Sequence, residues 1–169
     1  TEEVEPAVLT LQQVRGEDSL PEELEASADT DQANVLEIDL LWERYFRHAH
    51  QVGLAHANRF LVSWVEFEIA LRNALAAARA GRLELDESDY IIAADLAHSD
   101  EDLSGILSGW EAAATPLAAQ RAVIRTRWSW LDRHDRWYSF SVDELLAYAA
   151  RVMLLEQWLR TDVKEQAAR

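Results

Sequence analysis

Six polar side chains within one apolar segment are the residues of this chain whose types and spacing are best suited to chemistry. The segment covers residues 58–79, NRFLVSWVEFEIALRNALAAAR. At about 100° per residue on a helix, the six fall into two stripes: Arg59, Glu66 and Asn73 on one, and Glu68, Arg72 and Arg79 on the other. Each stripe holds acidic and basic groups, which suits ion pairing or the binding of a charged ligand.

Glu68 and Arg72 have the acid-before-base spacing of four that favours an ion pair along a helix. An exposed pair of this kind adds only about 0.2–0.5 kcal/mol. In a buried pair, the loss of one member is far more damaging because it leaves the other charge unpaired. Two roles stay open for the six side chains: an internal network that fixes the register of the helices, or a network that faces a partner protein.

Histidine spacing does not favour a metal site. His48 and His50 are two residues apart, so a helix sends them to different sides, and Asp95 with His98 lies in a segment of ambiguous structure. Di-metal bundles of the ferritin type need Glu-x-x-His motifs, and the chain has no Glu followed by His three residues later. We therefore expect no metal and no cofactor.

No catalytic motif is present in the sequence. The chain has no Walker pattern, no dinucleotide fingerprint and no nucleophile elbow. We therefore expect a protein that is not an enzyme, with no catalytic residues. The alternative is a small-ligand-binding or hydrolytic helical domain, in which Glu66, Glu68, Arg72 and the histidines converge on a pocket.

Composition limits the kinds of partner. The 169 residues carry a net charge of −15, which would repel nucleic acids and anionic lipids and favours basic protein partners. No uncharged run approaches the roughly 18 residues of a membrane-spanning helix. With no Cys in the chain, a reducing cytoplasm is the expected location, with any membrane association peripheral and without direct lipid insertion.

Charge also divides the chain into two regions. Residues 1–33 carry ten Asp or Glu against Arg15 alone, a net of −9, and this composition is typical of a solvated tail or linker. Residues 34–169 are predicted to form a helical domain. Because the chain begins at Thr1 with no signal peptide, we interpret it as the C-terminal part of a longer protein.

The elements that would position the polar stripes are all helical. Apolar positions keep a helical phase from Val35 to Ala78 across Gly53, which predicts one helix of roughly 70 Å over residues 34–80. Capping residues predict three shorter helices: one that starts at Ser99 with Asp102 and ends at about residue 114, and two over 116–134 and 142–159. A small-residue face at Gly105 and Gly109 predicts close packing of the first of these. The expected fold is an all-α bundle around one long central helix, with three or four shorter helices.

Tryptophans form a second group of candidates. Trp128 and Trp130 are two residues apart and so cannot share one helical stripe, which predicts an aromatic cluster that also includes Trp137 and Trp158. The last helix has an apolar stripe of Leu145, Tyr148, Val152, Leu155 and Trp158. An exposed Trp at the centre of a patch would instead mark an interface hot spot.

Two blocks of sequence resemble a known family. They cover residues 58–83 and 127–162, and the shared features are an Asn-Arg-Phe opening, a Trp-x-Trp-Leu run, and these single positions: Trp64, Glu66, Phe67, Asn73 and Trp158. The blocks are similar to an uncharacterised bacterial family encoded among V-type ATPase subunits, the domain of unknown function 2764. The resemblance covers about residues 40–165. Family members begin with a further N-terminal region that this chain lacks or replaces.

The resemblance implies a role in a V-type ATPase or ATP synthase. The family genes tend to occupy the place where the all-helical C/d-type subunit of the central stalk is otherwise encoded. That stalk component seats the rotating shaft on the membrane ring, so the resemblance implies a noncatalytic socket or assembly factor whose partners are other ATPase subunits. Fold class and gene position carry no residue-level role.

Overall fold

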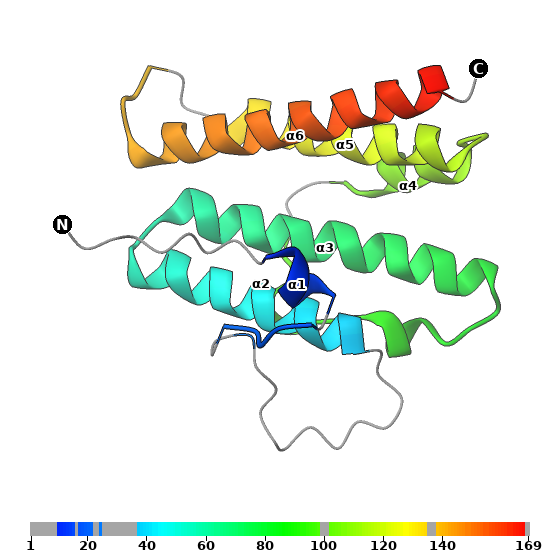
Figure 1. Ribbon diagram of the computed structural model, residues 1–169, viewed down its shortest axis with the longest axis horizontal. Helices are drawn as coiled ribbons and strands as arrows, with labels where there is room; N and C mark the ends of the chain where they lie inside the picture. Colours follow the sequence, from blue (N-terminus) through cyan, green and yellow to red (C-terminus); the bar gives the residue numbers. More distant parts are fainter. Residues whose placement is uncertain are drawn as a thin grey trace.

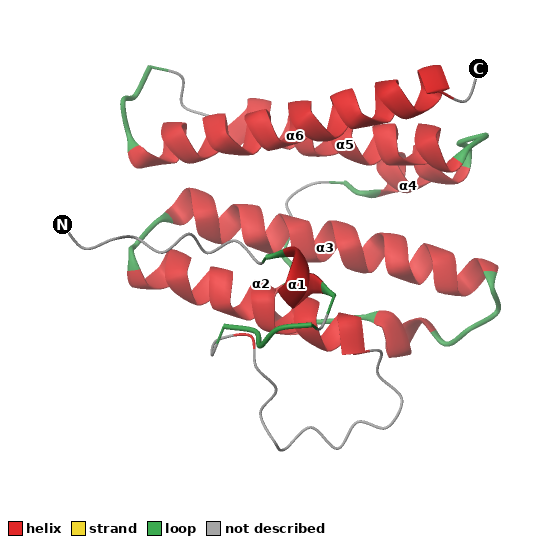
Figure 2. Ribbon diagram, in the orientation of Figure 1, coloured by secondary structure: helices red, strands yellow, loops and turns green. Residues whose placement is uncertain are grey.

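The structure is a computed structural model that describes residues 10–15, 17–21, 24, 37–98, 102–134 and 138–167. The fold is all-α, and no strand occurs among these residues (Figure 2). The elements in chain order are α1 (Leu11–Val14), α2 (Glu37–Ala55), α3 (Arg59–Arg82), the 3₁₀ turns η2 (Glu87–Tyr90) and η3 (Ala94–Leu96), α4 (Ser104–Glu111), α5 (Pro116–His134) and α6 (Val142–Ala167). The predicted tail, residues 1–33, lies largely outside the described residues.

Helix α3 lies at the centre of the fold. It packs against α2 on one side and against the layer formed by α4, α5 and α6 on the other, so α2 and α6 lie at opposite edges (Figure 1). The 3₁₀ turns that follow α3 also pack on it. An arrangement of this kind requires a helix that is apolar nearly all round, which residues 58–79 supply.

The single long helix predicted over residues 34–80 is wrong, because a turn at His56 and Ala57 divides it into α2 and α3. Ala57 has a left-handed φ of 49°, and the side chain of Asn58 caps α3 by accepting a hydrogen bond from the Leu61 amide at 2.7 Å. The apolar phase continues across the turn because α2 and α3 bury their stripes against each other as a hairpin. Sequence periodicity therefore could not distinguish one helix from two.

Gly53 allows close approach of the two helices rather than a kink. A Cβ at this position would lie 2.8 Å from Cγ2 of Val62 and 3.2 Å from the Val62 amide nitrogen. Only glycine leaves that space free without displacing a neighbour. Gly53, which does not interrupt the apolar periodicity, is thus a site of close contact between α2 and α3.

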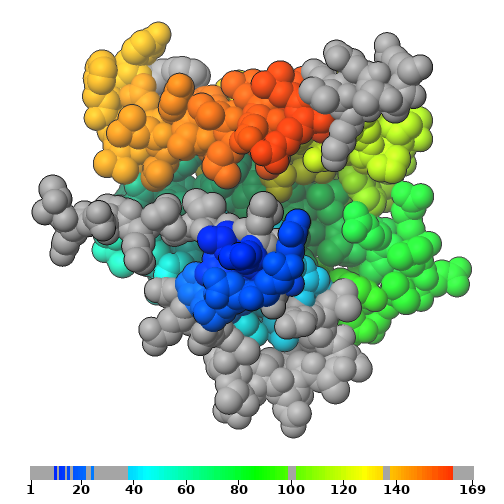
Figure 3. Space-filling view, in the orientation of Figure 1, coloured from blue at the N-terminus to red at the C-terminus, as the bar shows by residue number. Residues whose placement is uncertain are grey.

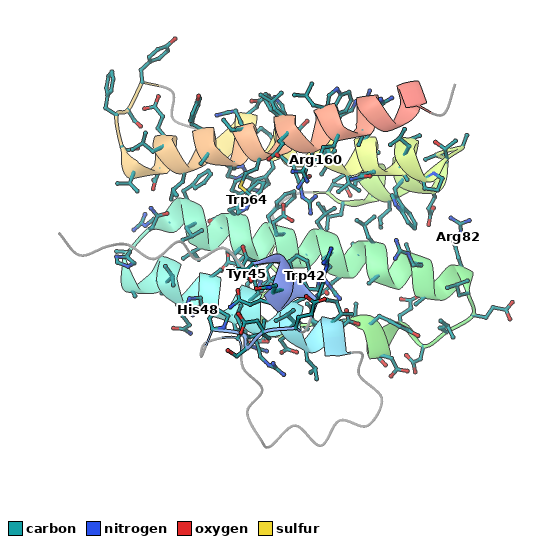
Figure 4. The ribbon with its side chains drawn as sticks, in the orientation of Figure 1. Trp42, Tyr45, His48, Trp64, Arg82 and Arg160 are labelled. Atoms are coloured by element: carbon teal, nitrogen blue, oxygen red, sulfur yellow. The ribbon has the colours of Figure 1, made fainter. Side chains whose placement is uncertain are left out.

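Two apolar clusters meet α3 from opposite sides. The first joins α3 to α5 and α6, and its buried members are Phe60, Phe67, Leu71, Ile124, Trp130, Leu131, Ala147 and Leu154. The second joins α3 to α2 and to the segment that follows α3. Its buried members are Phe46, Val65, Ile69, Ile92 and Ala93. Figure 4 shows Trp64 on α3 directed toward the α5 and α6 layer, where it packs against the first cluster.

Asn73 holds the middle of the segment between α3 and α4 at two points. The Asn73 amide group donates from Nδ2 to the Ile92 carbonyl at 2.8 Å and accepts from the Ile92 amide at Oδ1, at 3.2 Å. Asn73 and Ile92 are both buried. The paired hydrogen bonds fix the position of Ile92 against α3 although the segment has no regular ladder of its own.

Capping predictions for the later helices have mixed outcomes. Thr115 accepts a hydrogen bond from the Ala118 amide at 3.1 Å, which confirms the start of α5. Ser141 accepts from the Glu144 amide at 3.4 Å, but the Glu144 carboxylate binds the amides of Tyr138 and Phe140 instead of Ser141. Helix α6 continues to Ala167, beyond the predicted end at 159.

Helix α4 differs from its prediction in its length and its packing. It begins at Ser104, whose amide is bound by the Asp102 carboxylate at 2.9 Å, and ends at Glu111. A Cβ at Gly105 or Gly109 would meet nothing within 4 Å. The predicted close packing of this small-residue face is therefore wrong.

Candidate functional site

Glu68 pairs with a helix distant in sequence, not with its neighbour Arg72. Its two carboxylate oxygens accept hydrogen bonds from Nε and Nη2 of Arg127, both at 2.7 Å. The side chains of Glu68 and Arg127 are 12% and 27% exposed. A bidentate, mostly buried pair of this kind fixes α5 on α3 in one orientation.

Arg72 ties α3 to two other elements. It forms an ion pair with Asp39, a buried residue of α2, and its Nη1 donates to the Tyr90 carbonyl at 3.2 Å. The spacing of four between Glu68 and Arg72 does not produce a pair between them: Glu68 pairs with Arg127 of α5, and Arg72 pairs with Asp39 of α2. Each pair joins α3 to a different neighbouring helix.

Glu66 faces α2 through a histidine. Its Oε1 lies 3.2 Å from Nε2 of His50, and His50 is buried. The other ring nitrogen, Nδ1, is buried without a hydrogen-bond partner among the described residues. His50 therefore packs between α2 and α3, while Figure 4 places His48 on the outer side of α2.

Arg59 and Arg79 lie at the two ends of α3. Arg59 is exposed and lines a shallow depression of about 280 Å³ beside the turn between α2 and α3, together with Gly53 and Asn58. The guanidinium carbon of Arg79 lies over the Trp110 ring, 5.9 Å from its centroid. Asn73 bonds Ile92, so the six predicted side chains contact different partners along the length of α3 and do not all converge on one site.

Asp95 is part of a bridge between α2 and η3. Arg47 donates to its two oxygens at 2.8 and 3.0 Å and also to Glu43 at 2.8 Å. The Arg47 guanidinium lowers the pKa of the Asp95 carboxyl, and the two carboxylates raise the pKa of Arg47. Among the residues that the structure describes, no group of three or more His, Cys, Asp or Glu could hold a metal ion.

Three of the four predicted tryptophans, Trp128, Trp130 and Trp158, belong to the first apolar cluster. Trp130 is buried in the first apolar cluster, with its ring stacked on His134 and Phe67. Trp128 and Trp158 lie at its margin, under the guanidinium groups of Arg151, Arg121 and Arg125. Trp137 lies outside the described residues. The aromatic contacts of Trp130 come instead from α3, through Phe60, Trp64 and Phe67.

Exposed aromatic residues gather on α2, where no sequence pattern had indicated a site. Ile38, Trp42 and Tyr45, which we call the α2 patch, are 54%, 44% and 46% exposed and recur at helical spacing. The Trp42 ring stacks on the buried Phe46 and meets Tyr45 edge to face. Figure 4 shows Trp42 and Tyr45 near each other on α2. Partial burial, with a smaller effect from Glu68, raises the pKa of Tyr45.

The apolar stripe predicted for the last helix points away from the core. Leu145, Tyr148, Val152 and Leu155 are exposed, and Trp158 is half-buried. The buried side of α6 consists instead of Ala147, Arg151, Leu154 and Thr161. A hydrophobic stripe identifies a surface to be covered, but it does not show which stripe the chain itself covers.

Comparison with known proteins assigns a family and little else. The family model described as Protein of unknown function (DUF2764) matches residues 11–167, and the chain belongs to that family. No curated protein and no solved structure matches the chain. In the described part of the chain, no helix is both long enough and apolar enough to cross a membrane.

Proposed function

We propose that this member of the DUF2764 family is a noncatalytic helical subunit or assembly factor of a bacterial V-type ATPase or ATP synthase. Its sequence resembles a family encoded among the subunits of these complexes, at the place of the C/d-type subunit of the central stalk. The proposed role is a socket at the cytoplasmic face of a membrane complex, with other ATPase subunits as partners.

The observation that carries this proposal is the α2 patch. Trp42 lies at its centre, and tryptophan is the residue type most enriched in the energetic hot spots of protein interfaces. Residues 37–115, which include α2 and α3, contain six Arg against fourteen Asp or Glu, a net of −8. An apolar anchor on an acidic half of the fold suits a basic protein partner.

The internal ion pairs support a rigid binding module. Glu68 with Arg127 and Arg72 with Asp39 each join α3 to a different helix. Their charged groups hold the fold together, which leaves the partly exposed aromatic surface of α2 available for binding. The ligand-binding alternative has no comparable observation in its favour, because the three side chains bond different partners: Glu66 bonds His50 and Arg72 bonds Asp39, both of α2, whereas Glu68 bonds Arg127 of α5.

Purification of the native complex tests the proposal. An affinity tag on this chain should recover the rotary ATPase under mild conditions, and cryo-electron microscopy should place the helical domain against a neighbouring subunit. Trp42→Ala should reduce that recovery at least about tenfold if it removes a hot spot. Leu54→Ala is the matched control, since Leu54 is exposed on α2 but outside the patch. Recovery of the ATPase without this chain would overturn the proposal.

A further inference from the structure

Helix α6 carries a continuous apolar surface on its outer side. We call this surface the α6 face; its members, Leu145, Tyr148, Val152, Leu155 and Leu159, are 68%, 67%, 47%, 49% and 62% exposed. Helix α6 lies on the viewed surface of the molecule, at the edge opposite α2 (Figure 3). The α6 face is therefore open within the described structure, although its residues are of the types that normally form cores.

The spacing of the α6 face is that of a helix-to-helix seam. Successive members are separated by three, four, three and four residues, which is the repeat that keeps one stripe facing a partner helix. The seam extends for roughly 21 Å at 1.5 Å per residue. Because Ala147 and Leu154 already pack the opposite side of α6 on α5 and α3, this second stripe is not needed for the chain's own core.

The area of the α6 face is close to the lower limit for a dimer. Its five side chains expose on the order of 500 Å² of apolar surface, within the range of about 300–600 Å² for the largest patch on a monomer, which is often functional. Two such faces together would bury roughly 1,000 Å², which is near the lower bound for a specific interface. Val142, which is exposed one turn before Leu145, would add to that area.

The distribution of charge permits two copies to meet at this edge. Residues 116–161, which cover α5 and most of α6, carry seven Arg against five Asp or Glu, a net of +2, whereas the remaining residues sum to −17. Glu156 beside the seam is already paired with Arg160 at 2.6 Å, and the Glu144 carboxylate is bound to backbone amides. Contact through α6 would keep the two acidic halves at the far ends of the pair.

We propose that the α6 face binds the α6 face of a second copy of this chain. The α6 face can pair with an identical face because a two-fold axis brings the same surface of both copies together. With the axis beside Val152, the same five residues are buried on each copy. The pairing is independent of any role in an ATPase, because it requires only the chain itself. It leaves the α2 patch of each copy free at the outer edges of the dimer.

Sedimentation of the purified full chain tests the pairing directly. A concentration series should show a reversible shift from monomer to dimer. Leu155→Glu should raise the dissociation constant at least about tenfold, equal to 1.4 kcal/mol, because a charge would enter the apolar seam. Leu54→Glu should leave the dissociation constant unchanged, since Leu54 is similarly exposed but lies on α2. Circular dichroism should confirm that both variants keep the helical fold.

Cross-linking gives a second readout that does not depend on affinity. The chain has no Cys, so Val152→Cys introduces a single thiol at the centre of the seam. A short bis-maleimide should link two copies of this variant and should not link copies that carry Leu54→Cys. A chain that stays monomeric at about 100 μM, or a Leu155→Glu variant that dimerises as well as the wild type, would overturn the proposal and leave the α6 face to a different protein.

Discussion

Helices α3 and α6 both carry apolar residues on more than one side, yet the fold covers them differently. Two clusters enclose α3, one shared with α5 and α6 and one with α2. Only one side of α6, which includes Ala147 and Leu154, is covered within the described structure, by residues of α3 and α5. The same composition therefore marks a central helix in one case and a helix with an unused binding surface in the other.

A matched pair of leucine substitutions tests this contrast most strongly. Leu71→Ala in α3 should lower the free energy of unfolding by about 3–5 kcal/mol, because Leu71 is fully buried and its loss leaves a cavity. Leu155→Ala in α6 should change the stability of the monomer by no more than about 0.5 kcal/mol. Urea denaturation of both variants at low protein concentration gives the comparison. Equal losses would show that α6 is as enclosed as α3.

The ion pair between α3 and α5 should have the next largest effect. Arg127→Ala leaves the Glu68 carboxylate mostly buried without its partner, so we expect a loss of about 2–3 kcal/mol. Arg160→Ala is the control, because Arg160 forms an exposed pair with Glu156 on α6 and should matter by less than about 0.5 kcal/mol. Chemical denaturation measures both. A small effect of Arg127→Ala would mean that water reaches Glu68 freely.

The close approach of α2 and α3 predicts a smaller effect. Gly53→Ala places a Cβ against Val62, so the gain in helix propensity should be outweighed by a net loss of about 1–2 kcal/mol. The same change at Gly105 in α4 should stabilise the chain, since nothing lies near that position. Thermal unfolding should show opposite signs for the two variants. A stabilising Gly53→Ala would show that the hairpin of α2 and α3 is loosely packed.

The start of α6 should give the smallest effect, seen as a dependence on pH. Hydrogen bonds from the amides of Tyr138 and Phe140 hold the pKa of Glu144 below its ordinary value of 4.5. A lowered folded pKa means that the stabilisation is complete above the ordinary value and is lost as pH falls through the folded one. Glu144→Gln should therefore reduce the loss of stability between neutral and acidic pH, measured by thermal unfolding. An unchanged pH profile would contradict this role.

Local patterns in the sequence predicted the parts of the fold that depend on neighbouring residues. The all-round apolar character of residues 58–79 correctly indicated a helix packed on several sides. Thr115 and Pro116 located the start of α5, since a cap is a contact within one turn. The break before α3 was missed because periodicity outweighed the capping residue Asn58, which is visible in the sequence.

Long-range partners were beyond prediction from local patterns. Glu68 pairs with Arg127, which lies fifty-nine residues later in the sequence, and Arg72 pairs with Asp39, which lies thirty-three residues earlier. Spacing along one helix favoured Glu68 with Arg72, and nothing in the sequence indicates that a second helix supplies a better geometry. The direction of the stripe on α6 was hidden for the same reason, because it depends on which surface α5 leaves uncovered.

The hydrogen bonds between Asn73 and Ile92 have a consequence for how this region can change over time. Asn73 bonds only the backbone carbonyl and amide of Ile92, so these hydrogen bonds do not depend on the side chain at position 92. Substitutions in the connection from Leu83 to Ile91 can therefore accumulate while the anchor persists. Asn73 itself has no such freedom, because Asp would set a carboxylate oxygen against the Ile92 carbonyl and Leu would offer neither hydrogen bond. One side chain thus lets an irregular connection diverge without losing its place on the central helix.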